Sequence, residues 1–125
     1  MKKLFFFAIF ISLLNSCDTN ENDFSRIQPF GAAEIEKIEI NGNQVIVTTV
    51  YGTPTPCWYF YKAENSNNDL VFTSKIFGKD DGDPCIQVIA SFKHDEKIIF
   101  SSGGEKILRF WQNDSTYLDT IITLQ

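Results

Sequence analysis

Short apolar and aromatic runs alternate with turn-forming residues from Ile35 to the end of the chain. No segment of eleven or more residues keeps a 3.6-residue apolar period without a turn former inside it. The pattern predicts eight strands, at residues 35–40, 44–51, 57–63, 70–77, 85–92, 97–100, 106–111 and 117–124. Strands this short with turn signals between them are typical of sandwiches and barrels. We therefore predict an all-β fold, an antiparallel β-sandwich of immunoglobulin-like shape.

Aromatic residues crowd the expected strand 57–63 on both faces. Alternation places Trp58 and Phe60 on one face, and Cys57, Tyr59 and Tyr61 on the other. Core packing explains most of these rings, but the second face must be either covered by a loop or exposed. Exposed aromatic residues often anchor protein recognition. Trp58 and Tyr59 are therefore the candidate binding residues.

The first sixteen residues have the build of a secretory signal peptide. Lys2 and Lys3 supply positive charge, and residues 4–14 form an apolar run interrupted only by Ser12. As a helix, eleven residues reach roughly 16 Å, about half of the ~30 Å hydrocarbon core of a bilayer. We expect residues 1–16 to be removed rather than retained as a membrane span.

The stretch Leu14-Asn15-Ser16-Cys17 resembles the lipobox of bacterial lipoproteins, with Asn15 as a departure from the usual pattern. The resemblance implies cleavage before Cys17 and acyl chains on that cysteine, which would anchor the protein to a membrane. The alternative is an ordinary signal peptide followed by an incidental or disulfide-bonded cysteine.

Residues 18–23 are polar and acidic, which predicts a flexible stalk over residues 17–33. The acidic stretch also resembles the export signal of Bacteroidota lipoproteins, with a merely solvated tether as the alternative interpretation. We expect a lipid-anchored protein of the cell membrane or outer membrane that faces the periplasm or the cell surface.

Charge and length limit the partners and the number of domains. Removing residues 1–16 takes away two lysines and no acid, so the formal net charge falls from −5 to −7. That sign argues against nucleic acid as a partner, since nucleic acid needs a cationic patch. Residues 34–125 suffice for one domain with a thin margin of stability.

Cys57 and Cys85 remain as a pair once Cys17 is assigned to lipid, and an exported chain meets an oxidising compartment. A disulfide between them is predicted to add about 3 to 4 kcal/mol of stability. Two free thiols or a metal pair are the alternatives. The portion from Gly52 to Gly104, with Thr-Pro-Cys-Trp-Tyr, Asp-Pro-Cys-Ile-Gln-Val and Ser-Gly-Gly, resembles small bacterial lipoproteins with disulfide-bonded β-sandwich domains. This resemblance implies a fold and no catalytic residue.

Candidate chemistry is sparse. His94, the only histidine, lies in the charged run Lys93-His94-Asp95-Glu96, which we interpret as a solvated turn. Asp80, Asp81 and Asp83 surround Gly82 and could offer oxygen ligands to Ca²⁺, but Asp and Gly also form ordinary turns. We expect no catalytic residue, no bound metal and no cofactor.

The leading hypothesis is therefore a non-enzymatic, lipid-anchored envelope domain that binds or scaffolds a protein or glycan ligand. A protease-inhibitor-like module, with the stiff loop 53–56 entering a target, is one alternative. A purely structural envelope lipoprotein is another, and a small hydrolase ranks last.

Overall fold

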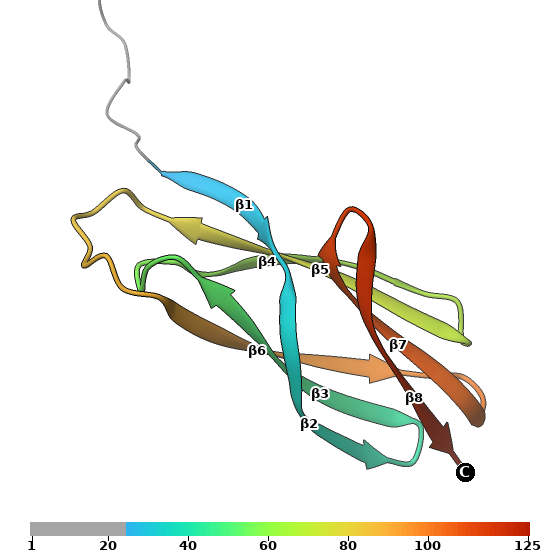
Figure 1. The fold of residues 1–125 in the computed structure, drawn as a ribbon. Coiled ribbons are helices and arrows are strands. Elements are labelled where there is room, and N and C mark those ends of the chain that lie inside the picture. Colours follow the sequence, from blue (N-terminus) through green and yellow to red (C-terminus); the bar gives the residue numbers. More distant parts are fainter. Residues whose placement is uncertain (1–24) are drawn as a thin grey trace, which may run out of the picture.

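The computed structural model describes residues 25–125, which contain eight strands and no helix (Figure 1). The expected signal peptide, residues 1–16, and the expected lipidation site Cys17 lie outside the described residues. The strands are β1 (Arg26–Phe30), β2 (Ala32–Asn41), β3 (Gln44–Thr53), β4 (Tyr59–Asn67), β5 (Val71–Asp80), β6 (Ala90–Ile99), β7 (Gly104–Asn113) and β8 (Thr116–Leu124). The predicted all-β fold is confirmed.

Two sheets face each other in a sandwich. The first is five-stranded: β5 pairs with β4 on one side and with both β1 and β7 on the other, and β8 pairs with β7. The second is three-stranded, in the order β2-β3-β6. All pairs are antiparallel except β5 with β7. β1 and β7 can share one edge of β5 because β1 pairs with residues 76–80 and β7 with residues 71–74.

The core lies between the sheets and follows strict alternation in the two central strands. Every second residue of β3 and of β5 is buried, while the residues between them are partly or fully exposed. The largest fully buried apolar side chains are Tyr51, Phe100, Phe110, Ile76 and Leu108. Gly31 lets the chain pass from one sheet to the other, because a Cβ there would lie 2.3 Å from the backbone oxygen of Gln112.

The prediction for residues 85–100 is wrong in two ways. Residues 81–89 form a loop with no strand, so Ile86 and Val88 of the expected strand 85–92 are exposed. β6 then runs unbroken through the expected turn at residues 93–96, paired with β3 from Ala90 to Ile99. The run contains no Gly, Pro or Asn to break a strand, and its charged residues Lys93, Asp95 and Lys97 point outward.

β1 lies inside the segment expected to be a flexible stalk, so the folded domain begins before residue 34. Phe30 is buried and its ring meets that of Trp58 edge-on, with 5.0 Å between centroids. Pro29 is tolerated because β1 pairs with β5 alone, and a strand with an unpaired edge can accept proline.

The sandwich has two distinct ends. At the first, which we call the disulfide end, the bond between Cys57 and Cys85 joins the loop before β4 to loop 81–89, and β1 begins beside them (Figure 1). The predicted disulfide is confirmed. At the opposite end lie the β2–β3 turn, the β4–β5 turn, the β6–β7 turn and residue Gln125.

No helix within residues 25–125 is long and apolar enough to cross a membrane.

Three buried hydroxyls lie in the core, on Thr49, Tyr51 and Ser74, and none has a hydrogen-bond partner among the described residues. Burial also raises the pKa of Tyr51, because the phenolate would be charged in an apolar environment. Unfolded tyrosine ionises near pH 10, so the stability contributed by neutral Tyr51 is full below that pH and is lost as pH rises further.

Tyr51→Phe is expected to leave stability at pH 7 unchanged or raised, and to weaken the loss of stability above about pH 10. The ring can keep its stacked contact with Phe92, at 5.4 Å between centroids. Urea unfolding at both pH values measures the effect, with Tyr117→Phe on the surface as the control. A variant that is clearly less stable at pH 7 would mean that the hydroxyl has a partner.

Candidate functional site

The outer face of the five-stranded sheet carries aromatic rings and cations side by side. The even-numbered residues of β5 are buried, as are Lys106, Leu108 and Phe110 of β7, so their odd-numbered neighbours point to the outside of this sheet. We define the aromatic–cation face by four rings and four cations: Tyr61, Phe77, Trp111, Tyr117, Lys62, Lys75, Lys79 and Arg109. These residues come from all the strands of the sheet except β1.

Lys75 occupies the middle of this face. Its ammonium lies 4.6 Å from the ring centre of Trp111 on β7 and 5.5 Å from that of Phe77 on β5. Lys62 on β4 approaches the same Phe77 ring at 4.9 Å. Cation–π contacts of this kind stabilise by about 0.5 to 1 kcal/mol at exposed sites. The contacts hold a continuous row of side chains across three strands.

Two further contacts lie on the same face, one between β5 and β4 and one between β7 and the edge strand β8. Lys79 lies 5.5 Å from the ring centre of Tyr61, and Arg109 lies 4.6 Å from that of Tyr117. Arg109 Nε also donates to Asp119 Oδ1 at 3.1 Å. The face therefore combines large rings with cations, of which Lys62, Lys79 and Arg109 also pair with carboxylates.

The outer face of the three-stranded sheet is different in kind. Its outward residues on β3 and β6 include no aromatic side chain. Polar pairs cross the strands there, with Thr48 bonded to Asp95 at 2.6 Å and Lys93 to Glu36 at 2.7 Å. Exposed rings thus gather on one sheet of the sandwich.

The two residues predicted to bind a ligand lie apart, as their alternation implied. Trp58 is only 5% exposed and packs in the core against Phe30, so its expected place in an exposed patch is wrong. Tyr59 is exposed, and its hydroxyl donates to Asp81 Oδ1 at 2.9 Å. Tyr59 lies at the disulfide end of the outer face, next to Tyr61 along β4.

His94 lies in the middle of β6, where it points into the gap between β6 and β4. Its ring stacks on Phe60, with 3.9 Å between centroids and 12° between planes. Nε2 is 2.8 Å from Glu96 Oε1, and the other oxygen of Glu96 accepts from Asn65 Nδ2 at 3.0 Å. These contacts close one side of the sandwich, so the interpretation of His94 as part of a solvated turn is wrong.

Asp80 at the end of β5 and Asp81 directly after it are held in separate interactions. Asp80 is buried and accepts hydrogen bonds from the backbone N–H of Gly82 and from Arg26, both at 2.8 Å. The Gly82 bond, followed by the Arg26 bond, lowers the pKa of Asp80. Asp81 binds Tyr59, as described above. Within residues 25–125 no group of three His, Cys, Asp or Glu side chains is arranged to hold a metal ion, so Asp80, Asp81 and Asp83 form no such site.

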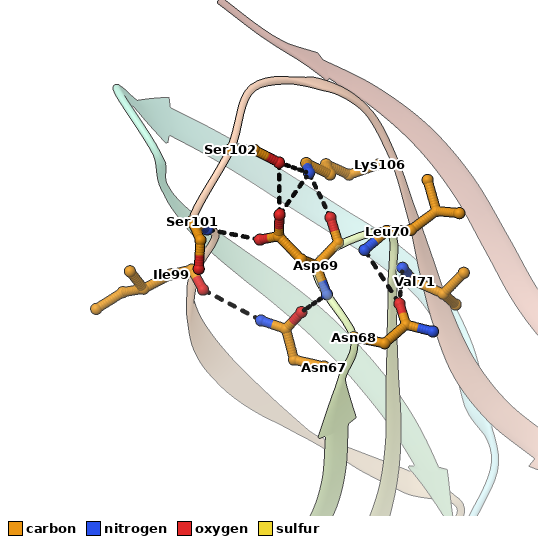
Figure 2. A network of polar contacts seen from close by, with 9 residues as sticks. All are labelled: Asn67, Asn68, Asp69, Leu70, Val71, Ile99, Ser101, Ser102 and Lys106. Carbon is orange, nitrogen blue, oxygen red and sulfur yellow. Dashed lines mark hydrogen bonds and ion pairs between the residues drawn. The ribbon is translucent and has the colours of Figure 1, made fainter.

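A polar network at the opposite end was not predicted from the sequence (Figure 2). Asp69 lies in the β4–β5 turn with a φ of +71°, and its carboxylate reaches the β6–β7 turn. It accepts hydrogen bonds from the backbone N–H of Ser101 at 2.6 Å and from the hydroxyl of Ser102 at 2.5 Å. These two bonds, that of Ser102 first, lower the pKa of Asp69.

Lys106 completes this network from β7. Its side chain is 3% exposed, and its ammonium donates to the backbone oxygen of Asp69, to Asp69 Oδ2 at 3.4 Å and to Ser102 Oγ at 3.0 Å. An ammonium has three donors, so all of them are used. A serine next to a lysine can serve hydrolysis, but here the Ser102 hydroxyl donates to Asp69 Oδ2 and only accepts from Lys106. We refer to the three residues Asp69, Ser102 and Lys106 as the corner clamp.

A hollow between the β2–β3 turn and the C-terminal residues is lined by Ile40, Gly42, Thr123 and Gln125, none of which has an ionisable side chain.

Comparison with known protein families, with curated proteins and with solved structures finds no match for this chain.

Proposed function

We propose that this chain is a lipid-anchored, non-enzymatic module of the cell envelope that binds a protein partner on the aromatic–cation face. The observation that carries the proposal is the position of Lys75 between Phe77 and Trp111 on an outward sheet face. Tyr, Trp and Arg contribute most of the binding energy at protein interfaces. All three residue types are present here, on a rigid sheet.

Protein is favoured over glycan by the way the rings are used. Sugars stack on the open faces of aromatic rings, but here ammonium or guanidinium groups lie over the rings of Phe77, Trp111 and Tyr117. The ion pairs within residues 25–125 do not include Lys75. A partner surface with an acidic group opposite Lys75, surrounded by apolar residues, would therefore complement the face.

The envelope location is supported by the chemistry of the chain. A structural disulfide is typical of an oxidising compartment. The lipobox-like stretch ending at Cys17 lies only eight residues before Ser25–Arg26, so a lipid there would hold the domain close to a membrane. The sheet face would then stand to the side of the anchor and remain accessible.

The proposal predicts that Lys75→Glu lowers the affinity for the partner by at least about 30-fold, the loss typical of a hot-spot residue. The measurement is photo-crosslinking on intact cells, with a photoreactive phenylalanine analogue at Tyr117. We expect one discrete crosslinked product that disappears when Lys75→Glu is added. Purified partner and mature protein then give the two affinities directly.

The matched control places the same analogue at Lys93, on the outer face of the other sheet. Lys93 should give no discrete product, and the melting temperature of Lys75→Glu should stay close to that of the parent. Similar, diffuse products from both faces would contradict a binding face and would favour a purely structural lipoprotein with many weak contacts.

A further inference from the structure

Loop 81–89 exposes an apolar tip at the disulfide end. The exposed fractions are 67% for Ile86, 51% for Val88 and 89% for Ile89. Between Cys85 and Ala90 the only polar residue is Gln87, whose side-chain amide donates back to the oxygen of Cys85 at 3.2 Å. Exposing three large apolar side chains together is costly in water, so the tip is a surface that another apolar phase would cover.

The loop is held in place before this tip by three contacts, and directly after it Ala90 pairs with Thr53 as β6 begins. The disulfide ties Cys85 to Cys57, and the N–H of Gly82 binds the buried carboxylate of Asp80 where the loop begins. The next residue, Asp81, is fixed by a hydrogen bond that it accepts from the hydroxyl of Tyr59. A loop restrained in this way loses little conformational entropy when its tip is covered.

The chain that precedes the structure leaves from the same end. β1 begins at Arg26, which pairs with Asp80, the last residue before the loop. Figure 1 shows the start of β1 and loop 81–89 side by side, with the C-terminus at the far end. Only eight residues separate Cys17 from Arg26, which span at most about 30 Å when fully extended.

We infer that the tip formed by Ile86, Val88 and Ile89 inserts into the lipid surface that holds the anchor, as a second point of membrane contact. The inference rests on the proposed lipid anchor at Cys17. A short tether gives the loop a high effective concentration at the bilayer, so a weak apolar contact is sufficient. Asp81 and Asp83 lie beside the tip, so contact is favoured on zwitterionic rather than anionic lipid.

Membrane contact would fix the orientation of the domain. The disulfide end would face the bilayer, the corner clamp would point away from it, and the aromatic–cation face would stand roughly upright. A protein covering the same tip would have to fit between the domain and the bilayer, within the reach of the tether.

The experiment uses the mature, full-length protein isolated from cells and reconstituted into phosphatidylcholine vesicles. With Cys17 acylated and the other two cysteines paired, Ile89→Cys introduces one free thiol for a polarity-sensitive fluorophore. Ile99→Cys is the matched control, because Ile99 is also an exposed isoleucine, at 66%, but lies at the opposite end. Unchanged melting temperatures confirm that both labelled variants are folded.

We expect the label at position 89 to shift its emission to shorter wavelength in vesicles and to lose most of its emission to nitroxide-labelled lipids. The label at position 99 should do neither. If the protein floats with the vesicles but both labels stay in water, the second contact is overturned while the anchor stands. If the protein does not float, the anchor fails and the inference with it. A blue shift at position 89 before vesicles are added means that a second copy covers the tip, which also overturns the inference.

Discussion

Replacing Asp69 by alanine is expected to lower the melting temperature by about 12 °C or more. The substitution leaves the ammonium of Lys106, which is 3% exposed, without its counter-charge. An uncompensated buried charge costs about 3 to 5 kcal/mol, and each kcal/mol corresponds to roughly 4 to 8 °C in a domain of this size. The corner clamp also joins the β4–β5 turn to the β6–β7 turn, so its loss loosens the connection between the two sheets. Thermal unfolding of the oxidised protein measures the effect.

The matched variant is Lys106→Met, alone and combined with Asp69→Ala. Methionine removes the buried charge and keeps most of the volume, while Asp69 retains Ser101 and Ser102 as donors and has access to water. Lys106→Met alone should therefore be much milder than Asp69→Ala, and the double variant should recover much of the lost stability. Equal losses in all three variants would mean that the side chains matter only for packing.

Acidification tests the same network from another direction. Because the pKa of Asp69 is lowered in the folded state, its stabilising effect is present above the pKa of the unfolded chain. That effect is lost as pH falls through the lower, folded-state pKa. The difference in stability between the parent and Asp69→Ala should accordingly shrink in acid.

The features that follow local rules could be predicted from the sequence. The Asn41-Gly42-Asn43 segment between the predicted strands 35–40 and 44–51 forms a hairpin turn, as its Asn and Gly residues favour, with Gly42 at a φ of +61°. The opposite orientations of Trp58 and Tyr59 follow from alternation, and the disulfide follows from the pair of cysteines that remains once Cys17 is assigned to lipid. The prediction of which aromatic side chains are exposed failed for Trp58, because burial of a strand face depends on which strands pack together.

Features that depend on distant partners could not be predicted. β1 has five residues and one proline, and it is ordered by pairing with β5, about fifty residues later. In the corner clamp, Lys106 lies 37 residues from Asp69. The Asn67-Asn68-Asp69 run indicates a turn, but it does not indicate that Asp69 binds residues of the distant β6–β7 turn and of β7. Residues 86–88 of the loop alternate between apolar and polar as in a strand, but they form none: β3 is already paired on both sides, with β2 and β6, and β5 ends at Asp80.

Replacing Cys57 by serine is expected to lower the free energy of unfolding by about 3 to 4 kcal/mol under oxidising conditions. The disulfide joins residues 28 positions apart, and closing a loop of that length raises the free energy of the unfolded chain by this amount, because it lowers its conformational entropy. Chemical denaturation with and without reductant measures it. With reductant, parent and variant should unfold at nearly the same denaturant concentration, since neither has the bond.

Loss of the disulfide should also have a local effect, since the bond holds loop 81–89 against the loop before β4. Limited proteolysis of Cys57→Ser should cut first within residues 81–89, and the reduced parent should be cut at the same place. The corner clamp lies at the other end of the sandwich, so Asp69→Ala should not expose this loop selectively. If the parent and Cys57→Ser unfold alike without reductant, the disulfide does not form in the protein. If the parent and Cys57→Ser differ in stability but not in the site of cleavage, the hydrogen bonds of Asp80 with Gly82 and of Asp81 with Tyr59 suffice to hold the loop. Its apolar tip would then remain available to the bilayer even in the reduced protein.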